Sequence, residues 1–239
     1  MSNRHSPSGC RFQDCRDHGP GSGAELLLVE GDSALASVAA VRDARNQGVL
    51  ALQGKPLNAW VASEGRVAQQ APYRLLAEAL GLARATALDA QALAQLRFER
   101  VVLLFDPDAD GIHIGALMVM YAQRWLPALI EGGRLWMARA PMFRLVAAAS
   151  GAVLHADHPA QCRAITERLR AQDDGRAPRV QAYRGLGGIE PAVLRQRCVD
   201  PATRTGHAVG ASDVRAVLSV FGGNHESGRS LHGREGADA

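Results

Sequence analysis

Apolar and polar positions form blocks along the chain, and these blocks predict strands and helices in turn. Short continuous apolar runs predict buried strands, and longer stretches with apolar residues at helical spacing predict helices. The expected strands are Glu25–Val29, Val49–Leu52, Val101–Phe105 and Arg134–Ala138, and the expected helices are Ala34–Asp43, Tyr73–Leu96 and Ile112–Ile130. This alternation predicts an α/β fold in which helices cover a parallel sheet.

Shorter elements follow towards the end of the chain. They are a segment of unassigned type at Ala152–His155, a helix at Ala160–Arg170, a strand at Arg179–Tyr183 and a helix at Pro191–Arg197. We therefore expect a main domain over 24–147 and a small C-terminal α/β appendage over 148–221. The ends, 1–23 and 222–239, are rich in Gly, Ser and charge, which predicts a flexible lead and a disordered tail.

Composition indicates a protein of ordinary globular type. The 239 residues are 47% hydrophobic and 21% charged, with a formal net charge of +3. A mildly basic balance permits contact with nucleic acid without requiring it. Aromatic residues make up only 5%, which argues against a protein that stacks single-stranded bases. Arginines between Arg163 and Arg179 are interpreted as a solvated helix face.

No membrane segment is expected. The longest apolar stretch, Ile112–Ile130, is nearly membrane length, but it contains His113, Gln123 and Arg124, which favours a core helix. The polar N-terminus is unlike a signal peptide, so we expect a cytoplasmic protein. The cysteines have no zinc-type spacing and are expected to be reduced thiols: Cys10, Cys15, Cys162 and Cys198.

Three aspartates at alternate positions follow the apolar run Val101–Phe105 directly. Asp106, Asp108 and Asp110 are succeeded by Gly111. Carboxylates this close repel one another unless some bind protons or a cation neutralises them. Because hard divalent ions prefer oxygen ligands, metal-assisted phosphate chemistry is the leading hypothesis for this segment.

The triplet alone is open to three interpretations. The first is a calcium loop of the EF-hand type, but its twelfth position, where an acid is needed, is Leu117. The second is an aspartyl phosphotransferase with Asp106 as nucleophile, although no downstream Thr or Ser and Lys clearly complete it. The third is a metal site completed by an acid from a neighbouring strand.

Such an acid follows the first predicted strand. Glu30 comes directly after Glu25–Val29. Open α/β sheets place their sites at the carboxyl ends of strands, so Glu30 faces the aspartates if the two strands are neighbours. Gly31 permits a tight turn, and Asp32 or Ser33 is expected to cap the next helix, which makes Ser33 a cap and not a nucleophile.

Taken in order, these segments resemble the Toprim domain of type IIA topoisomerase B subunits, the family of DNA gyrase and topoisomerase IV. The resemblance spans roughly residues 12 to 205 and rests on six short pieces. They are Glu30–Ala34, Gln53–Asn58, Phe105–Ile114, Ala140–Arg144, Tyr183–Gly187 and Asp200–Arg204. Each piece is weak alone, whereas six in the family's order are a strong signal.

The resemblance implies a Rossmann-like Toprim fold that binds Mg²⁺, with Mn²⁺ as a second candidate. It also implies contact with duplex DNA. By position, the implied metal ligands are Glu30, Asp106, Asp108 and Asp110. The implied catalytic residues are Glu30, Lys55 and Asp106. The implied DNA contacts are Lys55, Asn58, His113 and Arg184.

The implied reaction needs a partner. In the family, a tyrosine of an A-type subunit attacks the scissile phosphate, and the glutamate that matches Glu30 acts as general acid and base at the 3′ oxygen. Metal ions stabilise charge in such a displacement. The chain would thus be part of an isomerase, with ATP used only by a separate ATPase part. A stand-alone nuclease and a non-catalytic regulator docked on the A-type partner are the alternatives.

The chain also departs from the family pattern. Leu35 and Ala36 replace two glycines, and Ala39 replaces a lysine. Gln53 and Gly115 each stand where the family has an arginine, and Gly188 stands where it has a glutamate. Arg184 replaces a lysine. The four acids of the implied metal site are retained, which favours retained metal binding. We expect no ATPase or transducer domain before Ala24.

Overall fold

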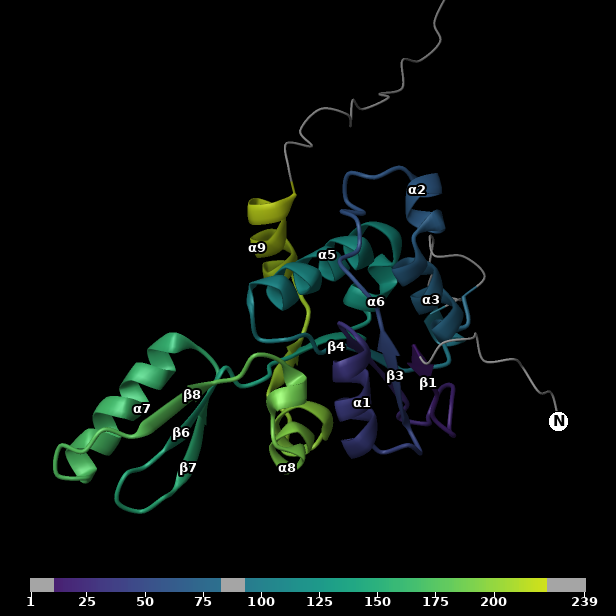
Figure 1. Cartoon of the computed structure of the whole chain (residues 1–239). Coiled ribbons are helices and arrows are strands. Elements are labelled where there is room, and N and C mark those ends of the chain that lie inside the picture. The colour runs from purple at the N-terminus through teal and green to yellow at the C-terminus, as the bar shows by residue number, and fades with distance from the viewer. Residues whose placement is uncertain (1–10, 83–92, 223–239) are drawn as a thin grey trace, which may run out of the picture.

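The computed structural model describes residues 11–82 and 93–222 of the chain (Figure 1). These residues form a six-stranded, mostly parallel sheet with helices on both faces, and a smaller three-stranded sheet beside it. The predicted α/β class, with a Rossmann-like sheet, is confirmed.

The main sheet has the strand order β1-β3-β2-β4-β5-β9. The four central strands are parallel, and the two edge strands are antiparallel to their neighbours. The strands are β1 (Phe12–Gln13), β2 (Glu25–Val29), β3 (Gln47–Ala51), β4 (Arg100–Leu103), β5 (Leu135–Ala138) and β9 (Gly206–Ala208). Because β2 and β4 are neighbours, their carboxyl ends meet at one edge of the sheet.

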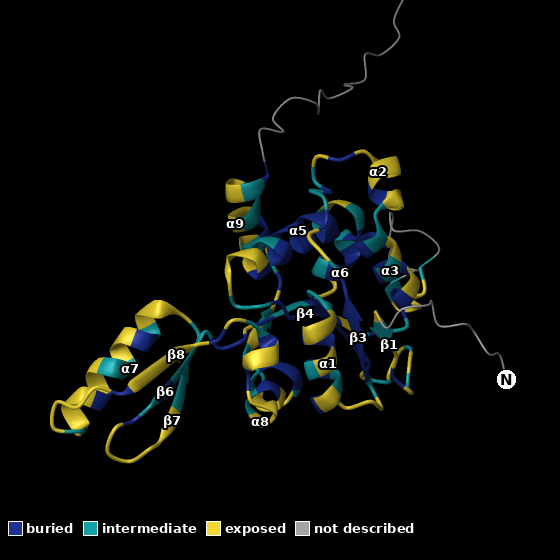
Figure 2. Ribbon diagram, in the orientation of Figure 1, coloured by how far each residue is buried: buried dark blue, intermediate teal, exposed yellow. Residues whose placement is uncertain are grey.

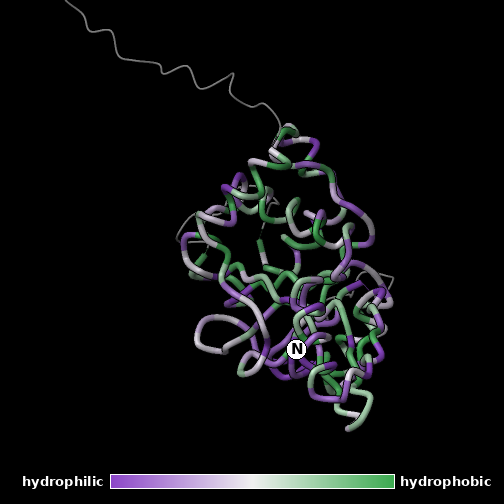
Figure 3. Tube along the Cα trace, turned by 90° about the vertical axis from the view of Figure 1, so that its left-hand side faces the viewer, coloured by the Kyte–Doolittle hydropathy of each residue, from purple (hydrophilic) through white to green (hydrophobic). Residues whose placement is uncertain are grey.

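Alternate strand residues serve two separate cores, as the period of a strand requires. Leu26 and Leu28 of β2 face one core, while Leu27 and Val29 face the other, and all four are 0% exposed. The first core lies under α3 (Ala71–Leu80), α5 (Ala109–Trp125), α6 (Pro127–Glu131) and α9 (Ala211–Phe221). The second lies under α1 (Asp32–Val41), α8 (Pro191–Leu194) and the helical turn Arg195–Val199. Figure 2 shows this buried interior, and Figure 3 shows the hydropathy of the same trace.

The long helix predicted over Ile112–Ile130 is instead two helices. It begins earlier, at Ala109, and ends at Trp125, and α6 then starts at Pro127. Leu126 has non-helical backbone angles (φ −135°, ψ 48°), because the ring of a following proline disfavours the helical conformation. Among the described residues no helix is long and apolar enough to cross a membrane.

The smaller sheet has the order β7-β6-β8 and lies to one side in Figure 1. Its strands are β6 (Phe143–Val146), β7 (Val153–Ala156) and β8 (Arg179–Ala182), and α7 (Pro159–Gln172) packs on it around Leu145 and Leu169. Beyond it, β9 and α9 return to the main sheet. The sequence pattern missed β6, β9 and α9, and the predicted domain boundaries stay predictions.

Two further expectations concern the ends of elements. Of the predicted lead, the described part contains β1, which pairs with β3. The helical stretch Tyr73–Leu96 is α3 at its start, and 83–92 lie outside the described residues, as does the predicted tail beyond residue 222. A short helix, α2 (Glu64–Gln69), precedes α3.

Candidate metal centre at the carboxyl edge of the sheet

Two of the predicted acids leave the sheet side by side. Glu30 directly follows β2, and Asp106 follows β4 after Leu104, whose N–H donates to the carbonyl of Leu28 at 2.9 Å. The parallel pairing of Leu28 with Leu103 brings both strand ends to the same edge. The expected juxtaposition therefore follows from register alone.

Asp106 is fixed by a segment 80 residues away in the sequence. The N–H of Leu186 donates to its Oδ1 at 2.9 Å. The chain reaches this point by a close approach: a Cβ added to Gly185 would lie 2.7 Å from Asp106 Oδ2, and one added to Gly111 would lie 2.1 Å from the Asp106 carbonyl oxygen. Both contacts are too short for any side chain, so these two glycines shape the site.

The other two aspartates are exposed at the start of α5. Asp108 is the N-cap of this helix, and its Oδ1 accepts from the N–H of Gly111 at 2.8 Å. Asp110 forms an ion pair of 2.8 Å with Lys55 Nζ. The hydrogen bond and charge of Lys55 lower the pKa of Asp110. Leu117, in contrast, is buried within α5, so the triplet does not belong to an EF-hand loop.

Burial, and after it the neighbouring acids, raise the pKa values of Glu30 and Asp106 at this edge. Burial raises the pKa of Glu30, and the charges of Asp106, Asp108 and Asp110 raise it further, against the opposing charge of Lys55. Burial also raises the pKa of Asp106, as does the charge of Asp108, although the N–H of Leu186 acts in the other direction. In both groups burial is the largest cause and repulsion by neighbouring aspartates adds to it, so a bound cation would favour the ionised forms.

This donor set fits a hard cation such as Mg²⁺. All four candidate ligands are carboxylates, the preferred donors of Mg²⁺. No three of these carboxylates have oxygens within 4.8 Å of one another. In the described part of the chain, one group of three acid, His or Cys residues is that close, and it lies elsewhere. A wide spacing suits Mg²⁺, since this ion keeps several water ligands and needs only one or two carboxylates.

The residues predicted to contact DNA have varied surroundings. Lys55 and Arg184 are exposed, with Lys55 held by Asp110. Asn58 donates from Nδ2 to the carbonyl of Phe221 at 3.2 Å, and the ring of His113 stacks on that of Phe221 at 5.1 Å. The two therefore contact α9, which the sequence pattern did not predict.

Sequence reasoning was wrong about the cap of α1. The N-cap is Gly31, and no side chain caps the helix; α1 begins at Asp32. The carboxylate of Asp32 instead accepts from Gln53 Nε2 at 2.7 Å. This hydrogen bond links the turn after β3 to the turn after β2. Gln53 has a positive φ of 53°, which a residue other than glycine rarely adopts.

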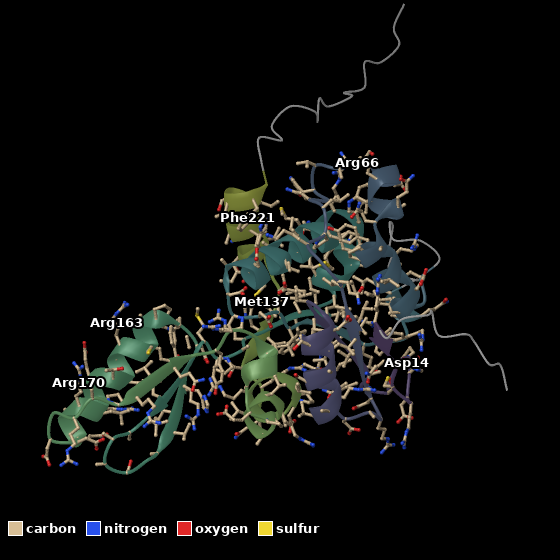
Figure 4. The ribbon with its side chains drawn as sticks, viewed as in Figure 1. Asp14, Arg66, Met137, Arg163, Arg170 and Phe221 are labelled. Carbon is tan, nitrogen blue, oxygen red and sulfur yellow. The ribbon has the colours of Figure 1, made fainter. Side chains whose placement is uncertain are left out.

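A largely apolar cavity of about 660 Å³ opens next to Asp106. It lies between the start of α5, the end of β5 and α9, and Figure 4 marks two of its lining residues, Met137 and Phe221. Arg163 and Arg170 on α7 are exposed and lie well away from this edge of the sheet (Figure 4).

Residues 25–140 match the family model described as the Toprim domain. The chain therefore contains a Toprim domain and is related to the B subunits of type IIA topoisomerases.

The individual relatives are bacterial proteins. The B subunit of DNA topoisomerase 4 from Pseudomonas aeruginosa is 33% identical over 211 residues, 88% of this chain and 32% of that protein. The Haemophilus influenzae protein of the same name is 37% identical over 180 residues, 75% of this chain and 27% of that protein. The B subunit of DNA gyrase from Thermus thermophilus is 31% identical over 212 residues, 88% of this chain and 32% of that protein. The chain thus spans about a third or less of each relative.

Proposed function

We propose that this chain is the Toprim module of a type IIA topoisomerase, corresponding to part of its B subunit, which binds Mg²⁺ and duplex DNA and supports strand cleavage and religation by a partner's tyrosine. The observation that carries the proposal is the meeting of Glu30 and Asp106 at one sheet edge, where burial and the neighbouring aspartates raise the pKa of Glu30. Toprim domains in general bind Mg²⁺, and the named relatives are subunits of DNA topoisomerases.

In this proposal Glu30, Asp106 and Asp108 hold the ion, one or two of them directly and the rest through its water ligands, and Asp110 acts through Lys55. When bound, Mg²⁺ would neutralise charge on a phosphate and on the departing oxygen. The raised pKa of Glu30 suits a proton donor, because a general acid needs a pKa nearer to neutrality than that of an ordinary carboxyl group. Lys55 is exposed and pairs with Asp110, and in this proposal it contacts a phosphate.

The chain is not a complete reaction centre in this proposal, because the tyrosine and the ATPase part come from elsewhere. Arg184, Asn58 and His113 are the proposed DNA contacts, and the loss of basic residues at Gln53 and Gly115 predicts weaker contact than in relatives that retain them. Soluble, cytoplasmic behaviour is part of the same proposal.

Two measurements test it. Calorimetry should show Mg²⁺ binding that Glu30→Ala and Asp108→Ala abolish, whereas Asp174→Asn, an exposed charge removed far from the site, leaves binding unchanged. A cleavage assay with an A-type partner and an ATPase part added should give Mg²⁺-dependent cleavage, again lost in both alanine variants. Restored cleavage that survives both substitutions refutes the site.

The same assay separates the alternatives. Metal-dependent nicking by the chain alone, without the A-type partner, would establish a nuclease. Binding to that partner with no cleavage under any condition would establish a regulator.

A further inference from the structure

A second cluster of ligand-type side chains lies at the opposite edge of the main sheet. Asp14, Cys15 and His18 follow β1, and the chain there is held by the N–H of Arg16, which donates to the carbonyl of Arg45 at 3.0 Å, just before β3 begins. Figure 4 shows Asp14 away from Met137 and Phe221, two residues that line the apolar cavity. Nothing in the proposed topoisomerase chemistry uses these residues.

The spacing of this cluster fits one metal ion. One carboxylate oxygen of Asp14, Sγ of Cys15 and a ring nitrogen of His18 lie within 4.8 Å of one another, and no other such group of three occurs in 11–82 or 93–222. The sulfur is 3.5 Å from His18 Nδ1. Ordinary Zn–S and Zn–N bonds at a tetrahedral angle place the two atoms about 3.6 Å apart.

The three side chains already have hydrogen-bond partners in the fold. Arg97 donates to Asp14 Oδ2 at 2.6 Å and to His18 Nε2 at 3.0 Å, and Cys15 Sγ donates to the carbonyl of Asp17 at 3.1 Å, so a bound ion would replace some of these hydrogen bonds. Cys15 is 7% exposed, while Asp14 and His18 are more open to solvent. An ion could therefore enter from the exposed side.

We propose that Asp14, Cys15 and His18 form a binding site for a thiophilic divalent ion, Zn²⁺ by preference, distinct from the Mg²⁺ site. Thiolate and imidazole select zinc over magnesium, because Mg²⁺ takes oxygen ligands. Burial raises the pKa of the Cys15 thiol to about 11, so binding at neutral pH releases its proton to solvent as the Zn–S bond forms. Three ligands and the nearby charge of Arg97 predict weaker binding than in a four-ligand structural zinc site.

Co²⁺ is the probe, since its thiolate complexes absorb visibly and Mg²⁺ does not. Titration of the metal-stripped full chain should give a sulfur-to-cobalt charge-transfer band that Zn²⁺ abolishes and excess Mg²⁺ does not. Cys15→Ser should remove the band, and His18→Ala should weaken Co²⁺ binding at least tenfold. The matched thiol controls Cys162→Ser and Cys198→Ser should retain the band.

Each outcome decides the proposal. Absence of the band in the wild-type chain, or its persistence in Cys15→Ser, overturns it, as does loss of the band in Cys10→Ser alone. His18→Ala alters an exposed side chain, so circular dichroism should show a folded variant even if Cys15→Ser unfolds. Calorimetry in buffers of different ionisation enthalpy should show proton release with Zn²⁺, and none would contradict coordination by the thiol. Glu30→Ala leaves all these results unchanged, which separates this test from that of the Mg²⁺ site.

Discussion

The two ends of β2 carry a glutamate each, and the two side chains have opposite surroundings. Glu25, at the start, is 2% exposed and accepts two hydrogen bonds from Arg204 at 2.6 and 2.7 Å, one from Arg100 at 3.2 Å and one from Gln47 at 3.0 Å. Glu30, just past the end, is partly exposed and faces three aspartates.

The pKa values respond in opposite directions. Burial alone would raise the pKa of Glu25, but the hydrogen bonds and charge of Arg204, with help from Gln47 and Arg100, outweigh burial and lower it. For Glu30, the charge of Lys55 acts in the lowering direction but does not outweigh burial and the acidic neighbours, which raise the pKa. One glutamate is thus fully paired within the fold, and the other is left available for a cation or a proton.

The different surroundings of Glu25 and Glu30 give the two glutamates of one strand different roles: Glu25 stabilises the fold, and Glu30 is proposed to bind a cation. A compensated buried acid ties elements together: Arg204 belongs to the segment before β9, 179 residues from Glu25, and its guanidinium also lies over the ring of Trp136 at 5.6 Å. An uncompensated acid lowers stability unless something binds to it. Four predictions, in order of expected size, test this contrast.

The largest effect is expected for Arg204→Met. Removal of this 3%-exposed arginine leaves the charge of Glu25 largely unpaired, so the free energy of unfolding should fall by about 3 kcal/mol or more. Urea denaturation followed by circular dichroism measures it. Arg215→Met, on an exposed face of α9, is the matched control and should change stability by no more than about 0.5 kcal/mol.

A double substitution sharpens this result. Glu25→Leu combined with Arg204→Met removes both buried charges, and should recover about 1–3 kcal/mol relative to Arg204→Met alone. If the double variant were no more stable than the single one, packing on Trp136, and not the unpaired charge, would explain the loss.

Next in size is the pH dependence produced by Glu25. Its pKa is lower in the folded than in the unfolded chain, so its contribution is present above the unfolded value of about 4.3 and is lost as pH falls through the folded value. Unfolding free energy should therefore fall less steeply from pH 6 to pH 3 in Glu25→Gln than in the wild type. Parallel curves would contradict the paired state of Glu25.

The contrast also shows how far sequence reasoning reaches. The sequence predicted that Glu30 and Asp106 lie near each other, because each directly follows an apolar run that forms a strand. These two strands are parallel neighbours, so the residues after them reach the same edge of the sheet. Leu186 N–H and Arg204 were not predicted as partners of Asp106 and Glu25, because those contacts join segments 80 and 179 residues apart, and no local pattern encodes them.

Smaller misses had local causes. The break before Pro127 was readable from the proline itself, yet the continuous apolar pattern on both sides concealed it. The cap of α1 was assigned to Asp32 or Ser33 on propensity. The N-cap is instead Gly31, the helix begins at Asp32, and the Asp32 side chain accepts a hydrogen bond from Gln53. Tertiary contacts overrode a local preference in that case.

At the acidic end, Asp108 has both a structural and a proposed functional role, and two substitutions separate them. Asp108→Ala removes the hydrogen bond to Gly111 N–H and should cost about 1 kcal/mol of stability. Asp108→Asn keeps an N-cap acceptor and should cost little. Both should weaken Mg²⁺ binding measured by calorimetry, since both remove the charge. Equal stability of the two variants would show that the cap contributes nothing.

The smallest effect, and the most diagnostic in sign, is expected for Glu30→Gln. A raised folded pKa destabilises the chain as pH rises above the unfolded value, so removal of this charge should stabilise the Mg²⁺-free protein at pH 7, with no gain below about pH 4. Because Glu30 is partly exposed, solvent screening keeps the gain to a few tenths of a kcal/mol. Thermal unfolding at both pH values measures this. Added Mg²⁺ should then raise the Tm of the wild type more than that of Glu30→Gln, because the ion stabilises the folded state in proportion to its binding. If Glu30→Gln instead lost stability at pH 7 without Mg²⁺, the charge of Glu30 would be compensated within the fold, as that of Glu25 is.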